Sequence, residues 1–267
     1  MSSDDSPRTV FLLTDFGAGS PYVGAMKAVM LGIAPSLRIV DLCHDVPPQD
    51  VTAGALILGS LRRHIPPRSV VAAVVDPGVG SRRQLLAAAA GGIVWIAPDN
   101  GLLSCILPRR IPGGCLRRIA HKSLWLPRVS RTFHGRDIIA PVAARLASGM
   151  PIESVGPGAA RHVRLRFPAP RRDRTGISGR VVYADRFGNL VTNITEKMVS
   201  TLAAGGPITV RIAGRTISGL SATYSDAKPG RLLALVGSFE RLEIAVRNGS
   251  AAAELGAGPG DPVRVER

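Results

Sequence analysis

Residues 70–83 read VVAAVVDPGVGSRR, six apolar residues followed by an acid, a proline and two glycines. The apolar run predicts a strand covered on both faces, as in a sheet flanked by helices. Asp76 then stands at the carboxyl end of that strand, where open α/β sheets bind ligands. Arg83 can fold back across the glycine turn to meet this acid. Taken alone, the segment favours a simpler interpretation, a structural turn closed by one ion pair.

The preceding residues predict alternating strands and helices. A short apolar strand at 9–13 leads to Asp15, so a second acid lies at a strand end. Apolar spacing predicts helices at 23–33 and 51–62, with a strand at 37–42 between them. This order indicates a parallel sheet with helices on its faces. After residue 83 we expect strands at 85–90, 92–97 and 117–120 and helices at 102–107 and 138–148.

The second half of the chain has a different character. Residues 151–175 are rich in proline, glycine and arginine without periodicity, and we interpret them as a linker. Six short β-prone segments follow, which predict a small antiparallel barrel or sandwich: 181–183, 190–191, 208–212, 216–217, 232–236 and 242–246. We therefore expect an α/β N-terminal domain with a mainly parallel sheet at 1–170. A smaller all-β C-terminal domain should occupy 171–267.

The net charge of +15 raises the question of a nucleic-acid partner. The excess lies between residues 104 and 180, with sixteen Lys or Arg against three Asp or Glu. Most are arginines in short loop-like pairs, without a basic helical stripe or an aromatic RNA-binding motif. We interpret them as solvated loop residues and expect no nucleic-acid partner.

Composition also limits location and cofactors. No apolar run reaches the ~18–20 residues of a membrane span, and the start, MSSDDSPR, does not resemble a signal peptide. We expect a cytoplasmic protein without a membrane partner. The three cysteines form no CxxC pair and the five histidines are scattered, so we expect small buried thiols, no disulfide and no metal or redox cofactor.

Eight segments together resemble the S-adenosylmethionine hydroxide adenosyltransferases, the adenosine-forming S-adenosylmethionine hydrolases related to fluorinase and chlorinase. The segments cover nearly the whole chain and are TDFG (14–17), SPYVGAMKAVM (20–30), VDLCHDVPPQD (40–50), VVDPGVGSRR (74–83), APDNGLL (97–103), TFHGRDIIAPVAA (132–144), YADRFGNLVTNI (183–194) and GSFERLEIAVRNGSAA (237–252). Each is weak alone, but eight in this order are highly specific.

The resemblance implies that water or hydroxide attacks the ribose C5′ of S-adenosylmethionine and releases adenosine and methionine. It also implies a catalytic set of Asp76, Arg83 and His134. Arg82 competes with Arg83 for the cationic role; we choose Arg83 because it is the second arginine of the motif. The sulfonium is already a good leaving group, so the task is to supply a nucleophile. The arginine side chain stays protonated and therefore cannot serve as the base, whereas neutral His134 can accept a proton.

Substrate contacts are implied at both ends of the chain. A carboxylate accepts two hydroxyl hydrogen bonds, so Asp15 suits the ribose diol, as the resemblance also suggests. Asp185 matches a position that holds the methionine ammonium. The remaining implied contacts are Phe187, Asn189 and Asn248 at the adenine and Ser238 at the methionine carboxylate. Phe239 stands where the halogenating relatives carry an arginine, which leaves the carboxylate anchor open.

Two alternatives to a hydrolase are a halogenase and a sensor. A halogenase would form 5′-chloro- or 5′-fluoro-adenosine, but fluorinase has an extra loop after the DPxVG turn that residues 83–95 leave no room for. Its halide pocket also has a serine where this chain has Gly135. A sensor would bind S-adenosylmethionine without turnover. Finally, the resemblance implies a homotrimer whose active sites lie between the N-terminal domain of one subunit and the C-terminal domain of the next.

Overall fold

The computed structural model describes residues 9–109, 111–112 and 115–267. The chain divides into two compact units, Met1–Leu165 and Arg166–Arg267. Each unit has its own hydrophobic core, and each is described by itself below.

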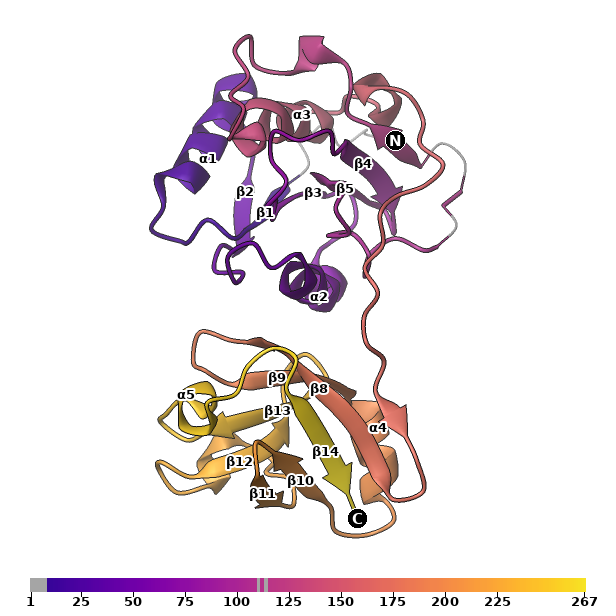
Figure 1. The fold of residues 1–267 in the computed structure, drawn as a ribbon. Coiled ribbons are helices and arrows are strands. Elements are labelled where there is room, and N and C mark those ends of the chain that lie inside the picture. Colours follow the sequence, from indigo (N-terminus) through magenta and orange to yellow (C-terminus); the bar gives the residue numbers. More distant parts are fainter. Residues whose placement is uncertain (1–8, 110, 113–114) are drawn as a thin grey trace, which may run out of the picture. The chain divides into compact units, whose positions relative to one another are not determined.

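The N-terminal unit is built on a six-stranded sheet with strand order β2-β1-β3-β5-β4-β6 (Figure 1). Its strands are β1 (Val10–Thr14), β2 (Ile39–Cys43), β3 (Val70–Val74), β4 (Leu85–Ala90), β5 (Ile93–Pro98) and β6 (Leu116–Arg118). The pairs β1/β2, β1/β3 and β3/β5 are parallel, whereas β4 is antiparallel to both its neighbours. All five residues of β3 are buried, as its apolar run predicts. The predicted mainly parallel sheet is confirmed.

Helices cover both faces of this sheet (Figure 1). On one face lie α1 (Pro21–Ile33) and α3 (Ala140–Ala147), and on the other lies α2 (Val51–Leu61). The start of α1 is fixed by Ser20, whose hydroxyl accepts from the Tyr22 amide. Asp50 caps α2 in the same way by accepting from the Ala53 amide at 2.9 Å.

The order of the strands creates a crevice at one edge of the sheet. From β1 the chain passes to β2 on one side and then to β3 on the other. The carboxyl ends of β1 and β3 therefore flank the topological switch point, where α/β sheets bind ligands. In the parallel register Thr14 lies opposite Val74, so the residues that follow both strands emerge at the same edge.

Residues 135–147 form one helical segment with a wide first turn. The turn is a π-helix, Gly135–Ile139, that continues into α3. Pro141 has no amide hydrogen to offer the Asp137 carbonyl four residues earlier. That carbonyl instead accepts from the Leu126 amide at 2.9 Å, which ties the preceding loop to the helix.

The expected helix at 102–107 is not formed. Residues 102–106 make successive turns, and the Leu107 amide bonds to the Leu103 carbonyl at 2.9 Å. The Asn100 side chain donates to the Val75 carbonyl at 2.8 Å, so this turn is fastened to the end of the central strand. A segment this short has little helical stability of its own, so its tertiary contacts decide its conformation.

The C-terminal unit is an eight-stranded antiparallel sheet with strand order β11-β10-β14-β8-β9-β13-β12, in which β7 pairs with β8 (Figure 1). Its strands are β7 (Arg171–Arg172), β8 (Gly176–Ala184), β9 (Leu190–Thr195), β10 (Thr209–Ile212), β11 (Arg215–Ser218), β12 (Leu232–Val236), β13 (Arg241–Val246) and β14 (Pro262–Glu266). A bridge between Ser221 and Leu235 brings the chain after β11 to β12, so the sheet nearly closes. The predicted all-β domain is confirmed.

Two helices in this unit are additional to the predicted strands, α4 (Glu196–Ala203) and α5 (Ala251–Leu255). The described residues of both units also form short 3₁₀ helices, at Arg62–His64, Lys122–Leu124, Ile152–Val155 and Tyr224–Asp226. In the ranges that the structure describes, no helix has the length and apolar character needed to cross a membrane.

Candidate functional site

The switch point of the N-terminal sheet opens into a cavity of about 380 Å³. Three residues expected at the site, Asp15, Asp76 and His134, line it. The other lining residues are Phe16, Tyr22, Pro48, Gln49, Val74, Pro77, Val79, Thr132, Phe133 and Gly135.

Asp76 and Arg83 form a closed pair beside this cavity. Arg83 Nε lies 2.7 and 2.8 Å from the two carboxylate oxygens of Asp76, and Nη2 also contacts Oδ2. Only 5% of the Asp76 side chain and 10% of the Arg83 side chain are exposed. Arg82, the rival in the sequence, is exposed. Several hydrogen bonds fix the geometry of this buried pair. Removing either partner would leave a buried charge without compensation, which is strongly destabilising.

The glycine turn after Asp76 brings the His134 loop against it. Gly80 has a φ of +80°, and a Cβ there would lie 2.5 Å from the Arg131 carbonyl oxygen. Only glycine combines this backbone conformation with so close an approach. The DPGVG turn therefore determines where the chain enters the helical segment that begins with His134.

His134 completes the arrangement from the start of the π-helix. Its Nδ1 lies 2.9 Å from Arg83 Nη2. A guanidinium has only donors, so Nδ1 is the acceptor and the ring proton resides on Nε2. Burial and the neighbouring Arg83 charge both lower the pKa of His134. The ring is therefore neutral near pH 7 and can take a proton only at the edge where it meets Arg83.

Asp15 lies directly after β1 on the other side of the switch point. Its Oδ2 accepts from the Gln49 amide at 2.8 Å. Burial raises the pKa of this carboxyl, and the negative charge of Asp76 adds to the effect. The Gln49 amide occupies one of the roughly four acceptor sites of the carboxylate, so acceptor sites remain for a ligand in the cavity.

An aromatic cluster, which the sequence analysis missed, borders the same cavity. The rings of Phe16, Tyr22 and Phe133 pack edge to face with centroids 5.2 to 5.8 Å apart. The Arg136 guanidinium lies 5.0 Å from the Phe133 ring centre. The residues stand within TDFG, SPYVG and TFHGR, but each looks like an ordinary apolar residue in the sequence. Their common location depends on the switch-point geometry.

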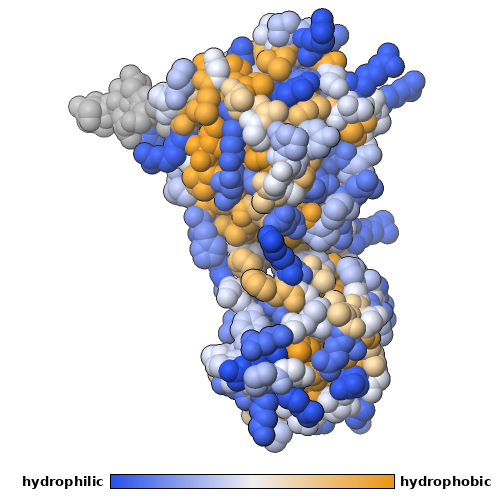
Figure 2. Space-filling view, turned by 90° about the vertical axis from the view of Figure 1, so that its left-hand side faces the viewer, coloured by the Kyte–Doolittle hydropathy of each residue, from blue (hydrophilic) through white to orange (hydrophobic). Residues whose placement is uncertain are grey.

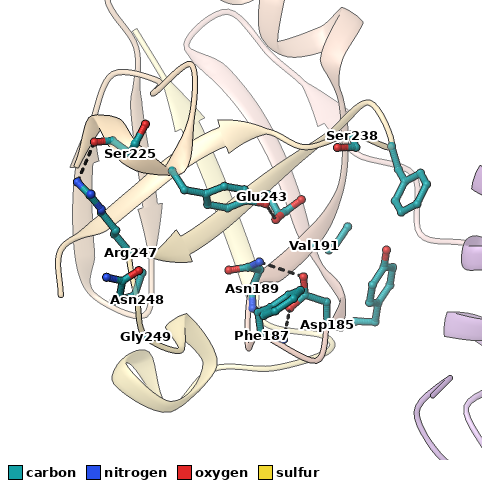
Figure 3. A pocket seen from close by; sticks show the side chains of 14 residues that line it. Asp185, Phe187, Asn189, Val191, Ser225, Ser238, Glu243, Arg247, Asn248 and Gly249 are labelled. Carbon is teal, nitrogen blue, oxygen red and sulfur yellow. Dashed lines mark hydrogen bonds between the residues drawn. The ribbon is translucent and has the colours of Figure 1, made fainter. Parts of the chain in front are cut away.

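The C-terminal unit has its own, larger pocket of about 700 Å³ (Figure 3). All five residues expected at the site in this half, Asp185, Phe187, Asn189, Ser238 and Asn248, line it. The other lining residues are Tyr183, Val191, Tyr224, Ser225, Phe239, Glu243, Val246, Arg247 and Gly249.

Asp185 organises the loop between β8 and β9. Its Oδ1 accepts from the Phe187 and Asn189 amides, both at 2.9 Å, and its Oδ2 accepts from the Asn189 side-chain nitrogen at 3.0 Å. The side-chain oxygen of Asn189, Oδ1, is thereby left to face the pocket as an acceptor. Phe187 is 76% exposed, so its ring is available for stacking.

Glu243 and Tyr224 were not predicted as site residues, because 242–246 was identified only as a short β-prone segment. Glu243 is 9% exposed, and the Tyr224 hydroxyl donates to its Oε1 at 2.7 Å. A lone acid within LEIAV was the available signal, since a carboxylate in a strand is seldom buried without a reason. Arg247, also missed, donates to the Ser225 and Ala227 carbonyls.

Neither metal ligation nor disulfide bonding is evident in the described residues. No three His, Cys, Asp or Glu side chains there are grouped as a metal ion would require. Cys43, Cys105 and Cys115 are not joined in disulfides. They are half-buried rather than buried, because each lies near the end of an element or in a turn.

Comparison with known proteins gives a consistent result along the chain. Residues 10–156 match the family model of the SAM hydroxide adenosyltransferase N-terminal domain, and residues 179–264 match the C-terminal domain of the same family. A Thermus thermophilus protein named (R)-S-adenosyl-L-methionine hydrolase is 40% identical, covering 97% of this chain and 99% of the relative. A Salinispora arenicola protein of the same name is 38% identical over 94% and 95% of the two chains.

The chain is also similar to a fluorinase sequence and to a solved structure. A fluorinase of Nocardia brasiliensis is 28% identical over 100% of this chain and 99% of its own. The crystal structure of an uncharacterized conserved protein from Thermotoga maritima superposes with a TM-score of 0.88 at 34% identity, covering 97% of this chain and all of that one.

Proposed function

The chain belongs to the S-adenosylmethionine hydroxide adenosyltransferase family, and on that premise we propose that it hydrolyses S-adenosyl-L-methionine to adenosine and L-methionine. The observation that carries the proposal is the contact of Arg83 with both Asp76 and His134 beside the switch-point cavity. Because the Thermus thermophilus and Salinispora arenicola relatives are named for the (R) epimer, we propose the (R)-sulfonium as the preferred substrate.

Arg83 and His134 divide the work on the attacking water. Asp76 fixes the guanidinium fork, so Arg83 holds a water at its junction with His134 and stabilises negative charge on the oxygen. The water replaces Arg83 as the partner of Nδ1, the one ring position able to accept a proton. As the bond from oxygen to C5′ forms, that proton moves to Nδ1 and the bond from C5′ to sulfur breaks. The bonding pair goes to sulfur, which leaves as the neutral thioether of methionine.

Binding of the substrate is assigned to the remaining residues. Asp15 accepts hydrogen bonds from the ribose diol, which aligns C5′ with the water; alignment of this kind can be worth roughly 7–11 kcal/mol. Phe187 stacks on the adenine, while Asn189 and Asn248 bond to its polar edge. Asp185 holds the ammonium and Ser238 contacts the carboxylate of the methionine portion.

We further propose a cytoplasmic homotrimer that needs no metal or redox cofactor. The ribose and water sites lie in the N-terminal unit, whereas the adenine and methionine sites lie in the C-terminal unit. A complete active site in the trimer takes the first from one subunit and the second from its neighbour. Full activity after dialysis against a chelator supports the absence of a metal; loss restored by one metal ion contradicts it.

The assay is incubation with each sulfonium epimer of S-adenosylmethionine in fluoride, chloride and halide-free buffer, with products identified by mass. Adenosine and methionine at a rate independent of halide are expected. Formation of 5′-chloro- or 5′-fluoro-adenosine would establish a halogenase instead. Tight binding without any product would establish a sensor.

A further inference from the structure

Glu243 is a buried carboxylate in the C-terminal pocket. Its neighbours Leu242 and Ile244 point into the hydrophobic core of the unit, so alternation along β13 turns Glu243 to the opposite face. There it lines the same pocket as Asp185 and Asn189 (Figure 3). Burying a carboxylate is costly unless a partner favours its charged form.

The surroundings make room for this carboxylate. A Cβ at position 237 would overlap Glu243 Oε2, so only glycine at this position leaves space for the carboxylate. From another element, Tyr224 donates its hydroxyl to Oε1. Burial raises the pKa of Glu243, and the negative charge of Asp185 raises it further. The Tyr224 hydroxyl holds the group in place, but it supplies no positive charge.

Asp185 alone has little capacity left for a cation. A carboxylate has about four acceptor sites, and three of those on Asp185 are taken by the Phe187 amide, the Asn189 amide and the Asn189 side chain. An ammonium has three hydrogens to donate. Glu243, a second carboxylate on the same pocket, can accept the hydrogens for which Asp185 has no free acceptor site.

We propose that Glu243, positioned by Tyr224 and Gly237, shares the α-ammonium of the substrate with Asp185 and is a specificity-determining residue for the amino-acid portion. This inference rests on the proposed function, because it assigns part of the same substrate. It also explains why two carboxylates line one pocket in a strongly basic chain: the group they face in the complex is cationic.

The proposal predicts a pH dependence of a definite sign. The charged and titratable side chains that line the pocket with Glu243 are Asp185, Tyr183, Tyr224 and Arg247. Ammonium binding requires ionised Glu243, so affinity falls as the pH drops through its raised pKa. If protonated Glu243 instead donated to the substrate carboxylate, affinity would rise as the pH drops.

The experiment measures KM and kcat for S-adenosylmethionine, and Kd for adenosine by calorimetry, in the full-length protein. Glu243→Gln should raise KM about 10- to 100-fold, the range for a charge-assisted hydrogen bond, with little change in kcat. Adenosine has no ammonium, so its Kd should be unchanged. The matched control is Glu240→Gln, an exposed acid in the turn before the same strand, which should behave as wild type.

Tyr224→Phe removes only the hydroxyl and should raise KM by a smaller factor without affecting adenosine. Equal weakening of adenosine and S-adenosylmethionine by Glu243→Gln would show a structural role and overturn the proposal. An unchanged KM, or one that falls at low pH, would also overturn it. If the wild type turns over no S-adenosylmethionine, the proposed function fails, whatever the variants bind.

Discussion

At the scale of single residues, Arg83 connects the other two members of the proposed catalytic set. It bonds to Asp76 through Nε and reaches His134 through Nη2, so one side chain fixes the other two. In the sequence, only the position within the motif distinguishes Arg83 from Arg82. Their different environments follow from the turn, which exposes Arg82 and buries Arg83.

Lysine cannot reproduce the fork that Arg83 forms. We expect Arg83→Lys to keep the positive charge but lower kcat by at least about 100-fold, since it loses a preorganised donor. The matched control is Arg82→Lys, the exposed neighbour, which should retain wild-type kcat. Steady-state kinetics on both variants decide the matter, and near-normal turnover by Arg83→Lys would argue against the proposed role.

The pH profile reports on His134. Because burial and Arg83 lower its pKa below the ordinary value of 6.5, the neutral ring persists into mildly acidic solution. Protonation removes the acceptor, so kcat should be lost as the pH falls through this lowered pKa and be retained above it. In His134→Asn the remaining slow reaction should lack this acidic limb. An acidic limb centred above 6.5 in the wild type would contradict the assignment.

At the scale of elements, much of the fold could be predicted because apolar periodicity reports burial directly. The strands predicted at 85–90 and 232–236 coincide with β4 and β12. The helices α4 and α5 and the strands β7 and β14 were missed in the C-terminal unit. The helices are eight and five residues long, too short for a clear helical period. Only two apolar residues, Val263 and Val265, alternate in β14, and its pairing with β8 and β10 is nonlocal.

Site residues at the ends of elements were easier to anticipate than those within them. Acids and glycines after strands stand out in the sequence, as at Asp15 and Asp76. Glu243 lies inside a strand, and the aromatic cluster is assembled from three separate segments. Their proximity to a pocket depends on strand register and on the switch point, which local patterns do not specify.

The element that positions His134 gives a further prediction. Alanine at Gly80 must adopt a positive φ, costing about 1–2 kcal/mol, and its Cβ would also collide with the Arg131 carbonyl. Gly149 is the matched control, with a φ of +98° and nothing within 4 Å of a Cβ. Gly80→Ala should lower both the melting temperature and kcat, and Gly149→Ala only the melting temperature. Equal kcat in the two variants would show that the turn does not set the position of His134.

At the scale of the whole molecule, the two pockets lie in separate units of the chain. The proposed trimer predicts complementation between two inactive variants, His134→Ala in one unit and Asn189→Ala in the other. Co-expressed chains should recover part of the wild-type turnover, because some sites would join an intact N-terminal unit to an intact C-terminal unit. Each variant expressed alone is the control. No recovery in mixed assemblies, or only monomer in sedimentation, would contradict this arrangement.

In the proposed reaction, water activated by Arg83 and His134 attacks C5′ of S-adenosylmethionine. Running the reaction in water labelled with heavy oxygen and measuring the products by mass tests this attack. We expect adenosine to carry the label in its 5′-hydroxyl and methionine to be unlabelled. Unlabelled adenosine, label in methionine, or a halogenated nucleoside in place of adenosine would contradict it.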